Sequence, residues 1–175
     1  MNGSDEVTYA WHCDQLPPAH LPVRQVYGWV LDARARVVLL RDLGRWNLPG
    51  GEPETRDGGD RAATLRREVW EEVQVTLADP VYLGYQSVDG LGAPFAQVRM
   101  AARLHRLAER APDPDKNRIH ERHLLPLDRA VELLDWGPSV LPQVAHLTRV
   151  VAERWGLHAR TGRPLQERHA HGARR

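Results

Sequence analysis

One stretch of the chain, from Leu48 to Val75, constrains its fold more than any other. A Pro-Gly-Gly turn at positions 49–51 leads into a polar loop, and the loop leads into a segment with helical periodicity. At about 100° per residue, Glu68, Glu71 and Glu72 share one narrow face of this helix. An apolar face lies roughly a quarter turn away and consists of Ala62, Leu65, Val69 and Val73. The pattern predicts an amphipathic helix with clustered carboxylates beside its buried side.

The three carboxylates repel one another and raise each other's pKa unless a cation lies among them. A divalent hard cation is the simplest compensation, and oxygen ligands favour Mg²⁺ or Mn²⁺ over zinc. Taken alone, the cluster fits a solvated, salt-bridged face equally well, because Arg67 and Glu71 have the i,i+4 spacing of an ordinary ion pair. The order of glycine turn, polar loop and acidic helix favours the metal site.

This stretch resembles the Nudix box, whose pattern is a glycine, five residues, a glutamate, seven residues and then Arg-Glu-apolar-x-Glu-Glu-x-Gly-apolar. Gly51 matches the opening glycine, and the core positions are matched by Arg67, Glu68, Glu71 and Glu72. The resemblance implies an α/β fold, namely a Nudix-type α/β/α sandwich with a mixed β-sheet.

The box departs from the family pattern in two ways. Fifteen residues separate Gly51 from Arg67, where the pattern has thirteen, and counting back from Arg67 puts Gly59 at the glutamate position. Three residues could replace that glutamate, and the choice stays open: Glu54, Asp57 and Asp60. Gln74 replaces the late glycine, which commonly ends a helix at positive φ, so we expect the helix end to differ in detail.

The resemblance implies hydrolysis of a nucleoside diphosphate linked to another moiety. Glu68, Glu71 and Glu72 would hold Mg²⁺ or Mn²⁺, with Glu71 either a ligand or the acceptor of the water's proton. Arg67 would orient the carboxylates, and the backbone at Gly50 and Gly51 would approach the substrate. A ligand-sensing or interaction module with little hydrolysis is the alternative, and an isomerase is a weaker one. The intact acidic trio favours the hydrolase, and the substrate stays unassigned.

The chain as a whole is typical of one soluble domain. It has 175 residues, of which 42% are hydrophobic and 27% charged, and its net charge is +1. That charge gives no reason to expect a specific nucleic-acid partner. The single cysteine, Cys13, and the absence of a membrane-length apolar run favour a cytoplasmic protein that binds no membrane. We expect a nucleotide-like small-molecule substrate, and the resemblance makes a homodimer possible.

Three regions are predicted: an extended lead-in over 1–22, the Nudix hydrolase domain over 23–156 and a basic, disordered tail over 157–175. Within the domain, apolar runs predict strands at 26–31, 37–40, 81–88 and 96–104, the first two joined by a short turn. A proline-started helix is expected over 124–136 and a second helix over 140–155.

Two further segments hold candidate binding residues. In the strand at 96–104, Arg99 and Arg103 lie opposite the apolar face, where solvent exposure is slightly favoured over a phosphate cleft. Arg99 is nevertheless the candidate for binding substrate. The polar loop over 109–123 offers three candidates for an extra acidic group, namely Asp113, Asp115 and Glu121. Arg118 and Arg122 are candidates for phosphate contacts, and His120 and His123 are a weak candidate for a metal pair.

Overall fold

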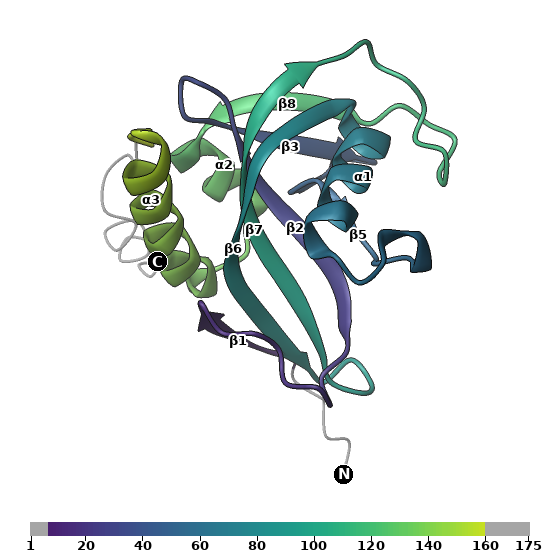
Figure 1. Cartoon of the computed structure of the whole chain (residues 1–175), viewed down its shortest axis with the longest axis vertical. Coiled ribbons are helices and arrows are strands. Elements are labelled where there is room, and N and C mark those ends of the chain that lie inside the picture. The colour runs from purple at the N-terminus through teal and green to yellow at the C-terminus, as the bar shows by residue number, and fades with distance from the viewer. Residues whose placement is uncertain (1–6, 160–175) are drawn as a thin grey trace, which may run out of the picture.

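A mixed sheet of eight strands forms the middle layer of the molecule in the computed structural model, which describes residues 7–159. Helix α1 covers one face of the sheet, and α2 and α3 cover the other (Figure 1). The predicted α/β/α sandwich with a mixed β-sheet is therefore confirmed. Residues 1–6 of the predicted lead-in and residues 160–175 of the predicted tail lie outside the described residues.

The elements follow in the order β1 (Thr8–Cys13), β2 (Val23–Leu31), β3 (Arg36–Asp42), β4 (Arg45–Asn47), β5 (Gly50–Gly51), η1 (Thr55–Asp57), α1 (Arg61–Val73), β6 (Val75–Asp89), β7 (Phe95–Leu107), β8 (Glu121–Pro126), α2 (Leu127–Leu134), η2 (Pro138–Val140) and α3 (Leu141–Trp155). The strand order is β1-β6-β7-β2-β3-β4, with β5 paired to β2 and β8 paired to β3. Among these described strands, β2 and β7 run parallel and the other pairs are antiparallel.

Strand β2 lies at the centre because both of its faces are apolar. Val26 and Val30 pack in the cluster that includes α1, whereas Trp29 and Leu31 pack in the cluster under α2 and α3. The strand pairs with β3 at Leu31 and Val37, beside the short turn expected between them. A strand covered on both sides reads as a continuous apolar run, as it does in the sequence.

Strand β7 differs from the half-buried strand that its alternation predicts. Its residues from Phe95 to Ala102 are buried or nearly so, because helices cover both faces of the sheet there. The slight preference for a solvent-facing Arg99 is wrong, since only 2% of this residue is exposed. Arg103, four residues on, has a half-exposed side chain near Asp79.

The segment before α2 is a strand and not the start of a helix. The helix predicted over 124–136 begins at Leu127, and the preceding residues form β8 along β3. Pro126 caps the helix in an extended conformation with ψ 147°. The apolar Leu124 and Leu125 suit a strand as well as a helix, so only the long-range pairing decides between them.

Helix α1 ends at Val73, and Gln74 follows in the left-handed conformation with φ 47°. The expectation that this helix end would differ from a glycine end is therefore wrong for the backbone. The conformation costs a residue with a Cβ roughly 1–2 kcal/mol. The Gln74 side chain offsets this cost: its Nε2 donates to Glu71 O at 2.9 Å and Trp70 O at 3.2 Å, and its Oε1 accepts from Ala111 N at 3.1 Å.

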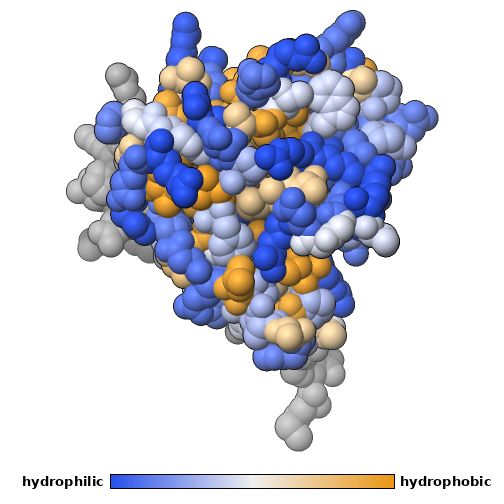
Figure 2. Space-filling model, viewed as in Figure 1, coloured by the Kyte–Doolittle hydropathy of each residue, from blue (hydrophilic) through white to orange (hydrophobic). Residues whose placement is uncertain are grey.

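The surface seen in Figure 2 is a mosaic in which hydrophilic residues separate small apolar patches. Within residues 7–159, none of the helices combines the length and the apolar character that crossing a membrane requires.

We predict that Gly84→Ala destabilises the protein more than Gly92→Ala. Both glycines have positive φ, at 140° and 83°, but a Cβ at Gly84 would lie 2.3 Å from His12 O of β1, whereas a Cβ at Gly92 meets nothing within 4 Å. Gly92→Ala should cost about 1–2 kcal/mol from backbone strain alone. Gly84→Ala should cost about 2 kcal/mol more, because β1 must shift.

Urea unfolding measures the two free energies, and amide hydrogen exchange along Thr8–Cys13 reports whether β1 is loosened. Equal destabilisation by the two variants, with β1 exchange unchanged, would contradict the steric explanation.

Candidate active site

The glycine turn brings backbone directly against the carboxylates of α1. A Cβ at Gly50 would lie 2.1 Å from Val26 O, and its φ of +147° also disfavours other residues. A Cβ at Gly51 would lie 2.5 Å from the Glu68 carboxylate. Because both positions lack side chains, Gly50 N can donate to Glu72 Oε2 at 2.9 Å.

Arg67 is the hub of the acidic face. Its Nη1 lies 2.8 Å from Glu68 Oε1 and 3.1 Å from Glu71 Oε2, so one guanidinium joins two of the predicted metal carboxylates. Its Nε and Nη2 donate to the two oxygens of Asp57, each at 2.9 Å. These hydrogen bonds, made by a side chain only 10% exposed, hold the pKa of Asp57 well below its usual range.

Among the three loop candidates, Asp57 is thus the one that accepts two hydrogen bonds from Arg67. It is 7% exposed and also accepts from Thr64 Oγ1 at 2.9 Å and Glu54 N at 2.8 Å. Glu54 contacts Arg67 from a 40% exposed side chain, and Asp60 instead caps α1 through Ala62 N. Counting forward five residues from Gly51, as the family pattern does, would have found Asp57.

Glu72 is the most buried of the three carboxylates, with 5% exposure. Burial raises its pKa to about 7. Two groups act in the opposite direction: the Gly50 N–H and the ammonium of Lys116, whose Nζ lies 3.1 Å from Glu72 Oε1. Burial also raises the pKa of Glu68. Two carboxylates that protein cations do not fully neutralise therefore lie side by side.

The late loop supplies part of this site, including a residue that the sequence did not single out. Lys116, which pairs with Glu72, lies 3.7 Å from Asp113 Oδ2. Asp113 is 3% exposed, and its Oδ2 lies 2.9 Å from His120 Nε2. The ligand atoms of Glu72, Asp113 and His120 lie within 4.8 Å of one another.

The other loop candidates are separated by the structure. Asp115 gathers with Glu54 and Glu71, whereas Glu121 lies on β8 and pairs with His123 at 3.0 Å. Arg118 pairs with Asp42. Arg122 donates to backbone carbonyls of Val73, Gln74 and Ala108. Both arginines therefore already have partners within the protein, and the two histidines have different partners, since His120 contacts Asp113 and His123 contacts Glu121.

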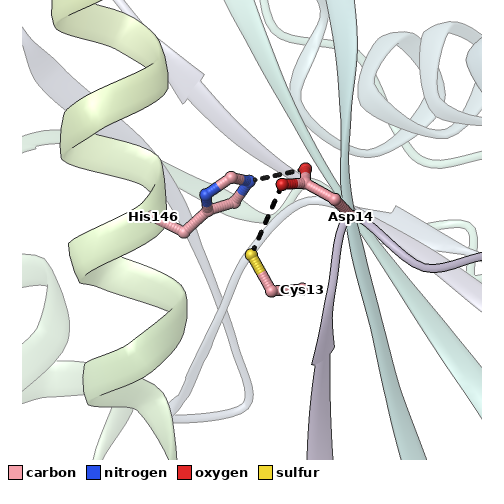
Figure 3. A group of neighbouring side chains, drawn as sticks. All are labelled: Cys13, Asp14 and His146. Atoms are coloured by element: carbon pink, nitrogen blue, oxygen red, sulfur yellow. Dashed lines mark hydrogen bonds and ion pairs between the residues drawn. The ribbon is translucent and has the colours of Figure 1, made fainter.

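A second cluster could be mistaken for a metal site. Figure 3 shows Cys13 and Asp14, at the end of β1, facing His146 of α3. Asp14 Oδ1 lies 2.9 Å from His146 Nε2, and Arg149 Nη2 lies 2.7 Å from His146 Nδ1. Because a guanidinium only donates, Nδ1 accepts from Arg149, so this nitrogen offers no lone pair to a metal.

A cavity of about 390 Å³ lies on the sheet face opposite α1, next to the acidic site. It is lined by Tyr9, Tyr27, Asn47, Gln86, Gln97, Arg99, Asp135, Trp136 and Ser139. Tyr27 separates it from the carboxylates, since Tyr27 pairs with Arg99 across the parallel ladder and with Gly50 on its other side. Burial raises the pKa of Tyr27, and the charges acting on it include those of Arg99, Glu72 and Lys116.

The predicted site residues thus fall into two groups. The acidic group brings together Gly50, Gly51, Arg67, Glu68, Glu71 and Glu72. Arg99 lies apart from it, in the cavity. The roles assigned to all of these residues stay predictions.

Comparison with known proteins identifies the class. The fold and the Arg-Glu-x-x-Glu-Glu helix are those of a Nudix-type hydrolase. The NUDIX domain family profile matches residues 21–147, so the chain belongs to that family. No curated protein matches the chain significantly.

Solved structures show the same fold at low sequence identity. A pyrophosphohydrolase from Bacillus subtilis is 17% identical with a TM-score of 0.65, over 85% of this chain and 93% of its own. A MutT protein from Bacillus halodurans is 21% identical with a TM-score of 0.53, over 70% and 81%. A NUDIX hydrolase from Nitrosomonas europaea is 17% identical with a TM-score of 0.54, over 74% and 90%.

We predict that Glu72→Gln stabilises the metal-free protein at about pH 8 but hardly at about pH 5. The pKa of Glu72 is about 7 in the folded chain and 4.5 ordinarily. Between these pH values Glu72 has lost its proton in the unfolded chain but keeps it in the folded chain. The free energy of unfolding therefore falls as the pH rises. Removing the charge should therefore add up to about 3 kcal/mol above pH 7, a figure that already includes the attraction between Glu72 and Lys116.

Thermal and urea unfolding in a chelator at the two pH values tests this, with the exposed Glu153→Gln as control. A Glu72→Gln variant that is less stable than the wild type at high pH would overturn the burial argument.

Asp57→Asn should lower the free energy of unfolding by about 3 kcal/mol, because a buried Arg67 loses a charged partner that accepts two hydrogen bonds. Glu54→Gln, in the exposed pair with the same arginine, should cost less than about 1 kcal/mol. Urea unfolding of both variants checks the difference. Similar losses would show that Asp57 is not the special partner of Arg67.

Proposed function

We propose that this protein is a metal-dependent hydrolase that cleaves the diphosphate linkage of a nucleoside diphosphate joined to another moiety. The observation that carries the proposal is the approach of two α1 carboxylates, Glu68 and Glu72, to the Gly50–Gly51 turn, with Glu71 joined to Glu68 through Arg67. Two of them, Glu68 and Glu72, are buried with raised pKa values. Buried carboxylates without full charge compensation are unfavourable, and a bound divalent cation would supply that compensation.

The donor set fits Mg²⁺ or Mn²⁺, because it consists of carboxylate oxygens. Glu68 and Glu72 would be the principal ligands. Once bound, the ion would neutralise diphosphate charge and lower the pKa of a water molecule. It would also take over the compensation of Glu72 that Lys116 supplies in the metal-free chain.

The chain's own groups support the hydrolytic step. The water oxygen forms a bond to one phosphorus, and the bond from that phosphorus to the bridging oxygen breaks, with its electron pair staying on the leaving phosphate. Glu71 either ligates the metal or takes the proton that the water releases. Arg67 holds Glu68 and Glu71 in position, since its Nη1 contacts both. The products are a nucleotide and a phosphorylated fragment, or phosphate.

The same proposal covers the substrate and its surroundings. The backbone at Gly50 and Gly51 would border the diphosphate, and Arg99 would bind another part of a nucleotide-like small molecule. The structural relatives include a pyrophosphohydrolase and a UDP-X diphosphatase. We further propose that residues 23–156 are the catalytic domain of a cytoplasmic protein, with a homodimer as the assembly to test and no specific nucleic-acid or membrane partner.

We predict turnover of nucleoside diphosphate derivatives that requires Mg²⁺ or Mn²⁺ and falls at least about a hundredfold in Glu68→Gln and Glu72→Gln. Each substitution keeps the shape of the side chain and removes the charge that would hold the ion. Release of phosphate or nucleotide, measured over a substrate panel, gives the rates.

Glu153→Gln on α3 serves as the matched control and should keep wild-type turnover. No turnover on any compound, together with unchanged ligand binding in the two site variants, would instead support the ligand-sensing module.

A further inference from the structure

The cavity beside the acidic site holds a buried cation without a counter-ion. Arg99 is 2% exposed, and no carboxylate in residues 7–159 pairs with it. Its Nη2 donates to Gln97 Oε1 at 3.1 Å and more weakly to Gln86 Oε1 at 3.5 Å, and its Nη1 donates to Val98 O at 3.4 Å. Its Nε is buried without a partner. Burial lowers its pKa to about 10. A buried guanidinium without a counter-ion is costly, so the unused N–H group of Arg99 points to a ligand that accepts a hydrogen bond.

The surroundings of Arg99 restrict how a ligand can approach it. Its guanidinium lies over the Tyr27 ring at 4.9 Å and the Trp136 ring at 5.1 Å from the centroids. Two aromatic rings occupy positions against the cation, so a partner must reach the edge of the guanidinium fork. The Gln86 carbonyl that borders this edge is held by Gln143 Nε2 at 2.8 Å, and Gln143 is itself buried. The fork is therefore preorganised.

The position of the cavity matches one end of the proposed substrate. Arg99 and Gly50 pair with the same residue, Tyr27, from opposite sides of β2. Two strand spacings put their backbones about 10 Å apart. A nucleotide with its diphosphate at the glycine turn can extend its base over this distance into the cavity. This step rests on the proposed function.

The remaining lining favours one base. Asp135, an exposed residue that follows α2, also lines the cavity, so an acceptor is available near the donor fork. Guanine presents O6 and N7 as paired acceptors and carries N–H donors on its neighbouring edge. Adenine presents an amino donor beside N7, and cytosine presents an amino group, so both would set a donor against the fork. Uracil presents the single acceptor O4 on this edge, so it would engage only one arm of the fork. A second anionic group would have to approach Asp135, which disfavours an extra phosphate or carboxylate.

We propose that this cavity recognises guanine, with Arg99 donating to O6 and N7 and Asp135 accepting from the 2-amino edge, so that the substrates are guanine nucleotides. Tyr27 and Trp136 provide aromatic walls against which a flat base packs. The volume of about 390 Å³ lies in the range of small-ligand sites.

Binding of nucleoside monophosphates tests the recognition separately from hydrolysis. In calorimetric titrations of the full chain, GMP should bind at least about tenfold more tightly than AMP, CMP or UMP. Arg99→Gln should abolish this preference, and Arg99→Lys should not restore it, because the ammonium lacks the fork. Asp135→Asn should shrink the difference between GMP and IMP, which lacks the 2-amino group. The control is Arg103→Gln, on the same strand with a half-exposed side chain, which should leave GMP binding unchanged.

Each alternative outcome has a definite meaning. Equal binding of GMP and AMP, or GMP binding that survives in Arg99→Gln, overturns the guanine assignment. Competition by ribose 5-phosphate as strong as by GMP shows a phosphate site and overturns it too. Turnover without base preference leaves the hydrolase standing and removes this inference. Selective GMP binding without turnover of any compound supports the inference and removes the hydrolase.

Discussion

The site depends on one guanidinium that is shared among several carboxylates. Arg67 contacts Asp57 in the loop and Glu68 and Glu71 on the helix, and its Nη2 also donates to Glu52 O after the glycine turn. Loop, turn and helix are separate segments that would otherwise repel one another at this point. Because every one of these contacts uses the same planar group, the loop conformation and the carboxylate geometry are coupled.

The central strand gives this cluster its relation to the rest of the sheet. Tyr27 pairs with Gly50 on one side and with Arg99 on the other, so a single residue separates the acidic site from the cavity. The two regions differ in electrostatics: carboxylates exceed cations around Glu72, whereas Arg99 lacks any counter-ion among the described residues. A molecule with a charged linkage at one end and a flat polar ring at the other satisfies both.

Local sequence patterns predicted most of the helices and strands, and the features they missed depend on contacts between residues far apart in the sequence. Helical spacing predicted α1, and apolar runs predicted the positions of β2, β3 and β7. Alternation along β7 could not tell that both faces would be covered, so the burial of Arg99 was missed. The pairing of β8 with β3 and the contact of Lys116 with Glu72 join residues far apart in sequence, which no local pattern reports. The spacing of residues along the sequence was enough to recognise the glycine turn and the acidic residues, but their roles stay predictions.

The loop between Asp57 and α1 bears on how such proteins are found. Gly58 and Gly59 have φ of 63° and 79° with open space around both, and nine residues separate Asp57 from Arg67 where the family pattern has seven. The added length bulges outward while the ion pair keeps its place. The loop therefore accommodates two extra residues without disturbing the ion pair, and a search that demands fixed spacing would discard a chain with this arrangement.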